Sequence, residues 1–122
     1  MPLDLPIISR QKHRTLINGE TIEFDRLEEK FNALVRWWRR DTLPISNQVK
    51  ILMHPAHFAI IGIGREALPY IFMDLAAGGG PWFAALEAIT QEDPIPAKDA
   101  KDASRMREDW LAWGRSHDYL GS

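Results

Sequence analysis

Apolar residues recur every three or four positions in several short stretches of the chain, and glycine or proline separates most of these stretches. The clearest stretch follows Asp25 and ends near Thr42, and its large apolar side chains form one stripe: Leu27, Phe31, Leu34, Val35 and Trp38. This spacing is typical of an amphipathic helix. Acidic residues at its start and arginines at its end suit the helix dipole, and Pro44 stops it. We therefore expect a helix over about residues 25–42.

The rest of the chain shows the same periodicity in shorter stretches. It predicts helices between Ser46 and Pro55, around residues 58–61, and over about 65–75, 81–90 and 102–115. Ser46 is placed to cap the first of these helices, and Pro81 suits the first position of its own. Pro69 falls in a first turn or kinks its helix. We expect the core to contain the following residues: Leu34, Trp38, Leu68, Phe72, Trp82, Leu86, Ile89, Trp110 and Trp113.

Residues 1–24 have a different pattern and are predicted to form an N-terminal arm on a helical domain of residues 25–122. Pro2 and Pro6 disfavour helix, and Asn18-Gly19 lies between two β-rich runs. Asn-Gly is the strongest short signal for a hairpin. An isolated hairpin is marginally stable in water, so it would have to lean on the helical body. An extended, irregular arm is the alternative.

Composition narrows the classes of function. The chain has 122 residues, which suits one small domain, and it has no cysteine, which excludes disulfides and cysteine-based catalysis or zinc sites. No apolar run approaches the roughly 20 residues of a membrane span. The N-terminus lacks the pattern of a secretory signal, so we expect a cytoplasmic protein without a membrane partner. The net charge of -2 means that any nucleic-acid binding needs a local basic patch.

The end of the first predicted helix contains the best candidate binding residues, which are Arg36, Trp37, Arg39 and Arg40. Helical phase places Trp37 about 100° away from the apolar stripe. An aromatic ring framed by arginines has the composition of an interface hot spot, and it could also stack on a nucleic-acid base. In the alternative interpretation, the N-terminal arm covers Trp37 and the arginines serve the helix dipole.

No set of residues indicates catalysis, so we expect the chain not to be an enzyme and to need no cofactor or metal. His54 and His57 are three residues apart, but the further ligands that a metal needs are distant in sequence. Gly78-Gly79-Gly80 lacks the lysine and hydroxyl of a phosphate loop. No serine lies in a nucleophile elbow. The acidic residues fall where helix capping explains them, and they indicate no carboxylate pair.

Residues 54–113 resemble a fragment of a bacterial HEAT-like helical repeat protein. The resemblance is carried by Gly64-Arg65-Glu66-Ala67-Leu68-Pro69, by Ala85-Leu86-Glu87-Ala88-Ile89-Thr90 and by Trp110-Leu111-Ala112-Trp113. The His54-Pro55-Ala56 start, the Ile60-Ile61-Gly62-Ile63-Gly64 turn and the Trp-x-x-Trp-Gly end are also similar to a family of small, uncharacterised bacterial proteins. Gln91 stands where these patterns have glycine.

The resemblance implies an all-α fold, either HEAT-like helical hairpins or a small irregular bundle, and it supplies no catalytic residue. We expect a non-enzymatic protein-binding module, such as an adaptor, an inhibitor or an antitoxin-like partner. The alternative is a nucleic-acid-binding accessory protein or small regulator. It would use basic residues of the arm together with the helix end at residues 36–40.

Overall fold

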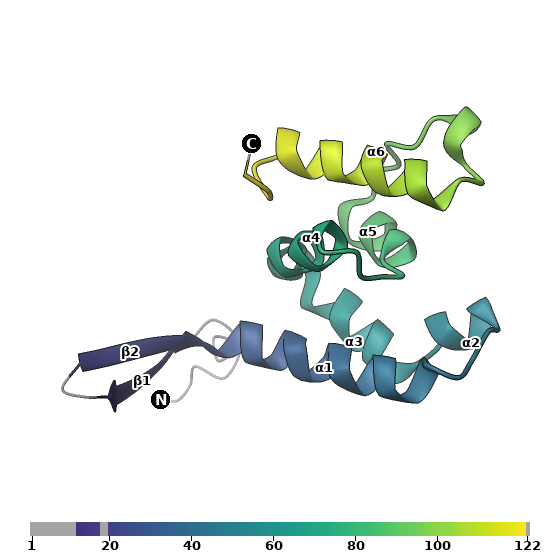
Figure 1. Cartoon of the computed structure of the whole chain (residues 1–122). Helices are drawn as coiled ribbons and strands as arrows, with labels where there is room; N and C mark the ends of the chain where they lie inside the picture. Colours follow the sequence, from purple (N-terminus) through teal and green to yellow (C-terminus); the bar gives the residue numbers. More distant parts are fainter. Residues whose placement is uncertain (1–11, 18–19, 122) are drawn as a thin grey trace. The chain divides into compact units, whose positions relative to one another are not determined.

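The computed structural model describes residues 12–17 and 20–121 of the chain. The chain divides into two compact units, residues 1–56 and residues 57–122. This division falls inside the range that the sequence predicts as one helical domain. The described residues are mainly helical, as expected, and the order of their elements can be followed in Figure 1.

The first unit contains two strands and two helices. Strands β1 (Lys12–Ile17) and β2 (Glu20–Asp25) pair antiparallel, with Thr15 opposite Ile22. The predicted Asn18-Gly19 turn and residues 1–11 lie outside the described residues. Helix α1 (Arg26–Thr42) follows β2 directly and confirms the first predicted helix.

The buried face of α1 is the predicted apolar stripe with one change. Leu27, Phe31, Val35 and Trp38 are buried, whereas Leu34 at the edge of the stripe is only half-buried. The indole Nε1–H of Trp38 donates to the carbonyl of Ile51 over 2.9 Å, which ties α1 to the short helix α2 (Gln48–Leu52). Trp38 therefore contributes apolar area and also satisfies its own polar atom.

Helix α2 differs from the prediction in its cap. Asn47, not Ser46, caps it by accepting a hydrogen bond from the Lys50 N–H over 3.2 Å. Either residue type can cap a helix, and the helix begins one residue later than a Ser46 cap requires. None of the residues of α2 is buried, and its five residues make little more than one turn.

Most of the second unit consists of short helices. Helix α3 (Pro55–Ile63) crosses the division between the units and ends at Gly64, whose φ of +82° favours glycine. A 3₁₀ turn, η2 (Gly64–Ala67), then leads into α4 (Leu68–Ala76). The predicted helix 65–75 is thus a 3₁₀ turn followed by an α-helix. Pro69 lies in the first turn of α4. It has no N–H to donate to the carbonyl four residues before it, so the α-helical hydrogen-bond pattern is interrupted at this point.

The remaining elements are α5 (Phe83–Thr90), the 3₁₀ turn η3 (Ala97–Asp99) and α6 (Ala103–Ser116). Pro81 precedes α5 instead of starting it, so that prediction is wrong. The reason is Trp82, which is buried before the helix begins and donates from Nε1 to Asp74 Oδ2 over 2.7 Å. Gln91 ends α5 in the left-handed region at a φ of 59°, at the position where the resembling patterns have glycine.

The core of the second unit lies where α4 packs on α6. Phe72 of α4 stacks on Trp113 of α6, with ring centroids 5.8 Å apart, and on Tyr119, with centroids 5.6 Å apart. Of the predicted core residues in this unit, only Ile89 is half-buried. The others are buried as expected: Leu68, Phe72, Trp82, Leu86, Trp110 and Trp113.

Candidate functional site

The predicted binding residues lie at the C-terminal end of α1. Trp37 is 38% exposed, and the neighbouring Trp38 is 1% exposed, so helical phase separated the two rings correctly. Arg36 and Arg40 are exposed on the same part of the helix, and Arg39 is half-buried. The Trp37 ring is therefore partly accessible beside two exposed guanidinium groups.

One edge of the exposed Trp37 ring is supported by His54. The two rings meet edge to face, with centroids 4.9 Å apart and planes 76° apart. His54 is itself held at both nitrogens. The Ala56 N–H donates to its Nδ1 over 3.0 Å, and its Nε2 lies 3.0 Å from Asp41 Oδ2. Because Nδ1 accepts, Nε2 must carry the proton and donate it to Asp41.

The same contacts affect the pKa of Asp41. The hydrogen bond from His54 is the main reason why the pKa of Asp41 is lowered, and Arg40, 3.4 Å from the same carboxylate, adds to the effect. His54 also caps the start of α3 by accepting the Ala56 N–H. Trp37 thus rests on an imidazole ring that neighbouring groups hold in place.

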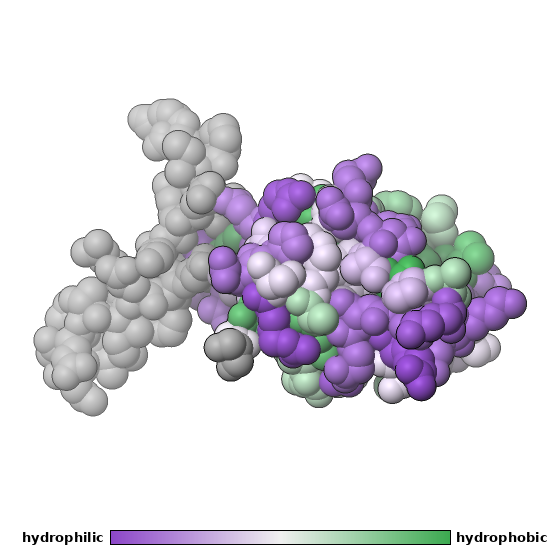
Figure 2. Space-filling view, turned by 90° about the horizontal axis from the view of Figure 1, so that it is seen from above, coloured by the Kyte–Doolittle hydropathy of each residue, from purple (hydrophilic) through white to green (hydrophobic). Residues whose placement is uncertain are grey.

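Large apolar side chains are also exposed in the segment that follows Trp37. Leu43 is 86% exposed, Val49 is 68% exposed and Met53 is 61% exposed. Val49 lies in α2 and Met53 follows it directly, within the stretch expected to form a short helix. We call the whole set the α1–α2 surface: Arg36, Trp37, Arg40, Leu43, Val49, Lys50 and Met53. On the face drawn in Figure 2, hydrophobic residues similarly come to the surface as small groups between hydrophilic ones.

The two other motifs weighed from the sequence have structural roles. His57 is 3% exposed, and no group of three or more histidine or acidic side chains is placed to hold a metal within residues 12–17 and 20–121. In the triple-glycine segment, the Gly78 and Gly79 N–H groups donate to the Leu75 and Asp74 carbonyls. These donors complete the end of α4 and do not form a phosphate loop.

The structure also brings together two carboxyl groups that sequence reasoning missed. They are Asp99 of η3 and Asp109 of α6, which lie close enough for Asp99 to affect the pKa of Asp109. Burial is the largest cause that raises the pKa of Asp109, and Asp99 raises it further, while Lys98 and Arg105 act in the opposite direction. Ten residues and a turn separate the two acids, so no motif could reveal the pair.

Comparison with known proteins adds no further assignment. No protein family, curated protein or solved structure matches this chain. Among the residues that the structure describes, no helix is both long and apolar enough to cross a membrane.

Proposed function

We propose that the chain is a non-enzymatic protein-binding module and that its partner contacts the α1–α2 surface. The observation that carries this proposal is the exposure of Trp37, Leu43, Val49 and Met53 within one short segment. Soluble proteins rarely expose neighbouring apolar side chains of this size unless something binds there. Tryptophan and arginine are also the residues that contribute most often to interface hot spots.

The charges of the α1–α2 surface favour an acidic partner. Arg36, Arg40 and Lys50 are exposed cations, whereas Asp41, next to Arg40 in sequence, is already engaged by His54 and Arg40. Complementary charge steers association and selects the partner. A protein surface that combines apolar groups with aspartate or glutamate satisfies both features. The resemblance of residues 54–113 to HEAT-like repeats supports a binding role of this kind.

A binding experiment with matched variants tests the proposal. A partner captured from the native cell is purified, and its affinity is measured by calorimetry for the wild type, Trp37→Ala and Met73→Ala. Met73 is the control because it is 61% exposed but lies on α4, outside the α1–α2 surface. We expect Trp37→Ala to weaken binding by about 2 kcal/mol and to change stability by less than about 0.5 kcal/mol. Met73→Ala should leave the affinity unchanged.

Two results would contradict the proposal. One is equal weakening by both substitutions, which would show that the α1–α2 surface has no special role. The other is a clear loss of stability in Trp37→Ala with the affinity unchanged once only folded protein is counted. That result would mean that Trp37 is covered within the chain, as the alternative interpretation holds.

Nucleic-acid binding is the second candidate, and the position of Trp37 between exposed Arg36 and Arg40 favours it. An aromatic ring beside cations can stack on a base while the arginines contact phosphates. The apolar side chains Leu43, Val49 and Met53 have no such role, and for this reason we place protein binding first. Anisotropy titrations with single-stranded DNA at several salt concentrations separate the two, because phosphate contacts weaken steeply with salt.

A further inference from the structure

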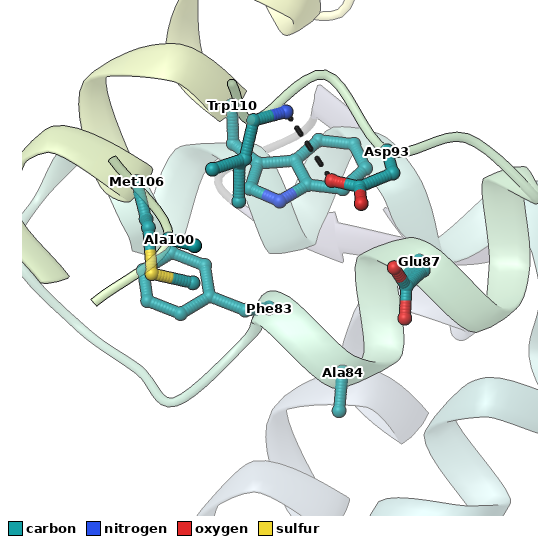
Figure 3. A pocket seen from close by; sticks show the side chains of 8 residues that line it. Phe83, Ala84, Glu87, Asp93, Ala100, Met106 and Trp110 are labelled. Carbon is teal, nitrogen blue, oxygen red and sulfur yellow. Dashed lines mark hydrogen bonds between the residues drawn. The ribbon is translucent and has the colours of Figure 1, made fainter. Parts of the chain in front are cut away.

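The second unit contains a pocket whose chemistry differs from that of the α1–α2 surface. Its volume is ≈ 200 Å³, which is below the roughly 300–1,000 Å³ of sites for drug-sized ligands. Helix α5 contributes one wall, the 91–96 loop and the turn after η3 contribute a second, and α6 contributes the third. The lining residues, most of which Figure 3 labels, are Phe83, Ala84, Glu87, Asp93, Ile95, Ala100, Met106 and Trp110.

The indole N–H of Trp110 is the first feature that points to a ligand. Trp110 is 1% exposed, and its Nε1 has no hydrogen-bond partner within the described part of the chain. In contrast, Nε1 of Trp38 donates to a backbone carbonyl, and Nε1 of Trp82 donates to Asp74. Figure 3 shows the Trp110 nitrogen facing the space bordered by Phe83, Met106 and Glu87. A buried donor without an acceptor is costly, so a ligand that supplies an oxygen there gains affinity.

The two acidic side chains of the lining are the second feature. Glu87 lies one helical turn after Phe83 on α5, and Asp93 lies in the following loop. Both are exposed, and neither forms an ion pair with another described residue. Asp93 Oδ1 accepts a hydrogen bond from the Ile95 N–H over 3.2 Å, which orients its carboxylate at the pocket, as the dashed line in Figure 3 marks.

The aromatic and thioether groups are the third feature. Phe83 and Trp110 lie on different helices and both line the space, and Met106 lies one turn before Trp110 on α6. Aromatic faces attract cations, and a planar guanidinium can stack on such a face while its N–H groups bind carboxylates. An ammonium group would bind the acids as a compact point charge and would use the flat faces less well.

Together these features assign the pocket to arginine chemistry. We propose that it binds a guanidinium on a short alkyl chain that also carries a carbonyl or carboxylate oxygen. The guanidinium stacks against the aromatic side chains and donates to Glu87 and Asp93, the methylene groups contact Met106, and the oxygen accepts the Trp110 Nε1–H. Free arginine and an arginine residue of a peptide both present this chemistry. The proposal does not rest on the function proposed for the α1–α2 surface.

The test uses the full chain labelled with ¹⁵N and follows the indole N–H signals of its five tryptophans during titration. The probes are L-arginine, Nα-acetyl-L-arginine N-methylamide and the uncharged Nα-acetyl-L-norleucine N-methylamide. We expect one arginine probe or both to move the Trp110 signal to saturation while the Trp38 and Trp82 signals stay in place. Saturation by the capped probe alone identifies a peptide residue as the ligand, and saturation by the free amino acid alone identifies arginine itself.

Variants separate specific binding from general attraction to an acidic protein. The double variant Glu87→Gln with Asp93→Asn should weaken binding at least about tenfold, because it removes both charge-assisted partners. Glu92→Gln is the matched control, since Glu92 is exposed and adjacent but does not line the pocket, and it should bind as the wild type does. Trp110→Phe keeps an aromatic ring but removes the donor and the reporting signal, so its affinity is measured by calorimetry, and it should also be weaker. The remaining indole signals report whether each variant is folded.

Three outcomes would overturn the proposal. The first is the absence of a saturable shift of the Trp110 signal with either arginine probe. The second is an equal shift with the norleucine probe, which would show that the pocket does not recognise the guanidinium. The third is a Glu92→Gln variant that weakens binding as much as the double variant, because the acids of the pocket would then act only through net charge.

Discussion

Replacing Gly114 with alanine tests the close packing of α6 on α4. Gly114 is buried within α6, and a Cβ at this position would lie 2.8 Å from Cδ1 and 2.9 Å from Cε1 of Phe72. Carbon atoms in favourable contact are about 3.5–4.0 Å apart. Phe72 cannot easily move away, because it is fully buried and its ring stacks on Trp113 and Tyr119. The helices or the rings must therefore shift.

Two opposing terms determine the size of the effect. Alanine is favoured over glycine within a helix by about 0.8–1.0 kcal/mol. Overpacking a well-filled core costs about 1–3 kcal/mol. The steric term is the larger, so we expect Gly114→Ala to lower the free energy of unfolding by roughly 1 kcal/mol.

Gly62→Ala is the matched control. Gly62 lies in α3, is exposed, and a Cβ there meets no atom within 4 Å. Only the helix-propensity term applies, so the free energy of unfolding of this variant should rise by up to about 1 kcal/mol. Urea unfolding followed by circular dichroism measures the free energy of unfolding of both variants. The dependence of that free energy on urea concentration should be the same as in the wild type. If Gly114→Ala is as stable as Gly62→Ala, the ring of Phe72 does not lie against Gly114 and our account of this helix pair is wrong.

Three further predictions concern α6. The raised pKa of Asp109 means that its carboxyl binds a proton more tightly in the folded chain, so its contribution to stability should be present at low pH and be lost as pH rises above the usual carboxyl pKa through the raised one. Asp109→Asn, which mimics the protonated form, should flatten this dependence in urea unfolding from pH 3 to 8, and an unchanged slope would refute the assignment. Asp102 caps α6 by accepting from the Arg105 N–H, and Asp102→Ala should cost about 1 kcal/mol, whereas the exposed Ser104→Ala should have little effect. Trp110→Ala should lower the free energy of unfolding by about 3–5 kcal/mol because the ring is fully buried. A thermal melt that shows a loss of less than about 1 kcal/mol would mean that α6 turns Trp110 toward solvent, contrary to the structure.

Long amphipathic helices were predictable from the sequence, and short ones were less so. Helix α1 has four turns and more, so its apolar period is well sampled and its start, end and buried face were nearly correct. Helix α2 has five residues, so Val49 and Met53 could not be assigned to a buried face from spacing. The position of Pro81 failed for another reason. Burial of Trp82, together with its hydrogen bond to Asp74, determines where α5 begins, and this tertiary contact leaves no trace in local sequence.

The candidate sites show a similar limit. Helical phase was sufficient to place Trp37 at the surface, because the buried stripe of α1 is unambiguous. The support of its ring by His54 depends on how the chain returns after α2, and sequence spacing does not contain that information. The Asp99–Asp109 pair and the pocket lined by Glu87, Asp93 and Trp110 likewise depend on packing across a loop and a 3₁₀ turn.

The tryptophans explain why burial and function need separate arguments. Periodicity indicates which rings face the core, because apolar area is a property of the whole side chain. It does not indicate where the indole N–H points, because that depends on single acceptor atoms elsewhere in the chain. Trp38 and Trp82 meet such acceptors, whereas the nitrogen of Trp110, buried to the same degree, faces the space bordered by Phe83, Met106 and Glu87. For this reason the strongest case for ligand binding comes from a residue that the sequence alone assigns to the core.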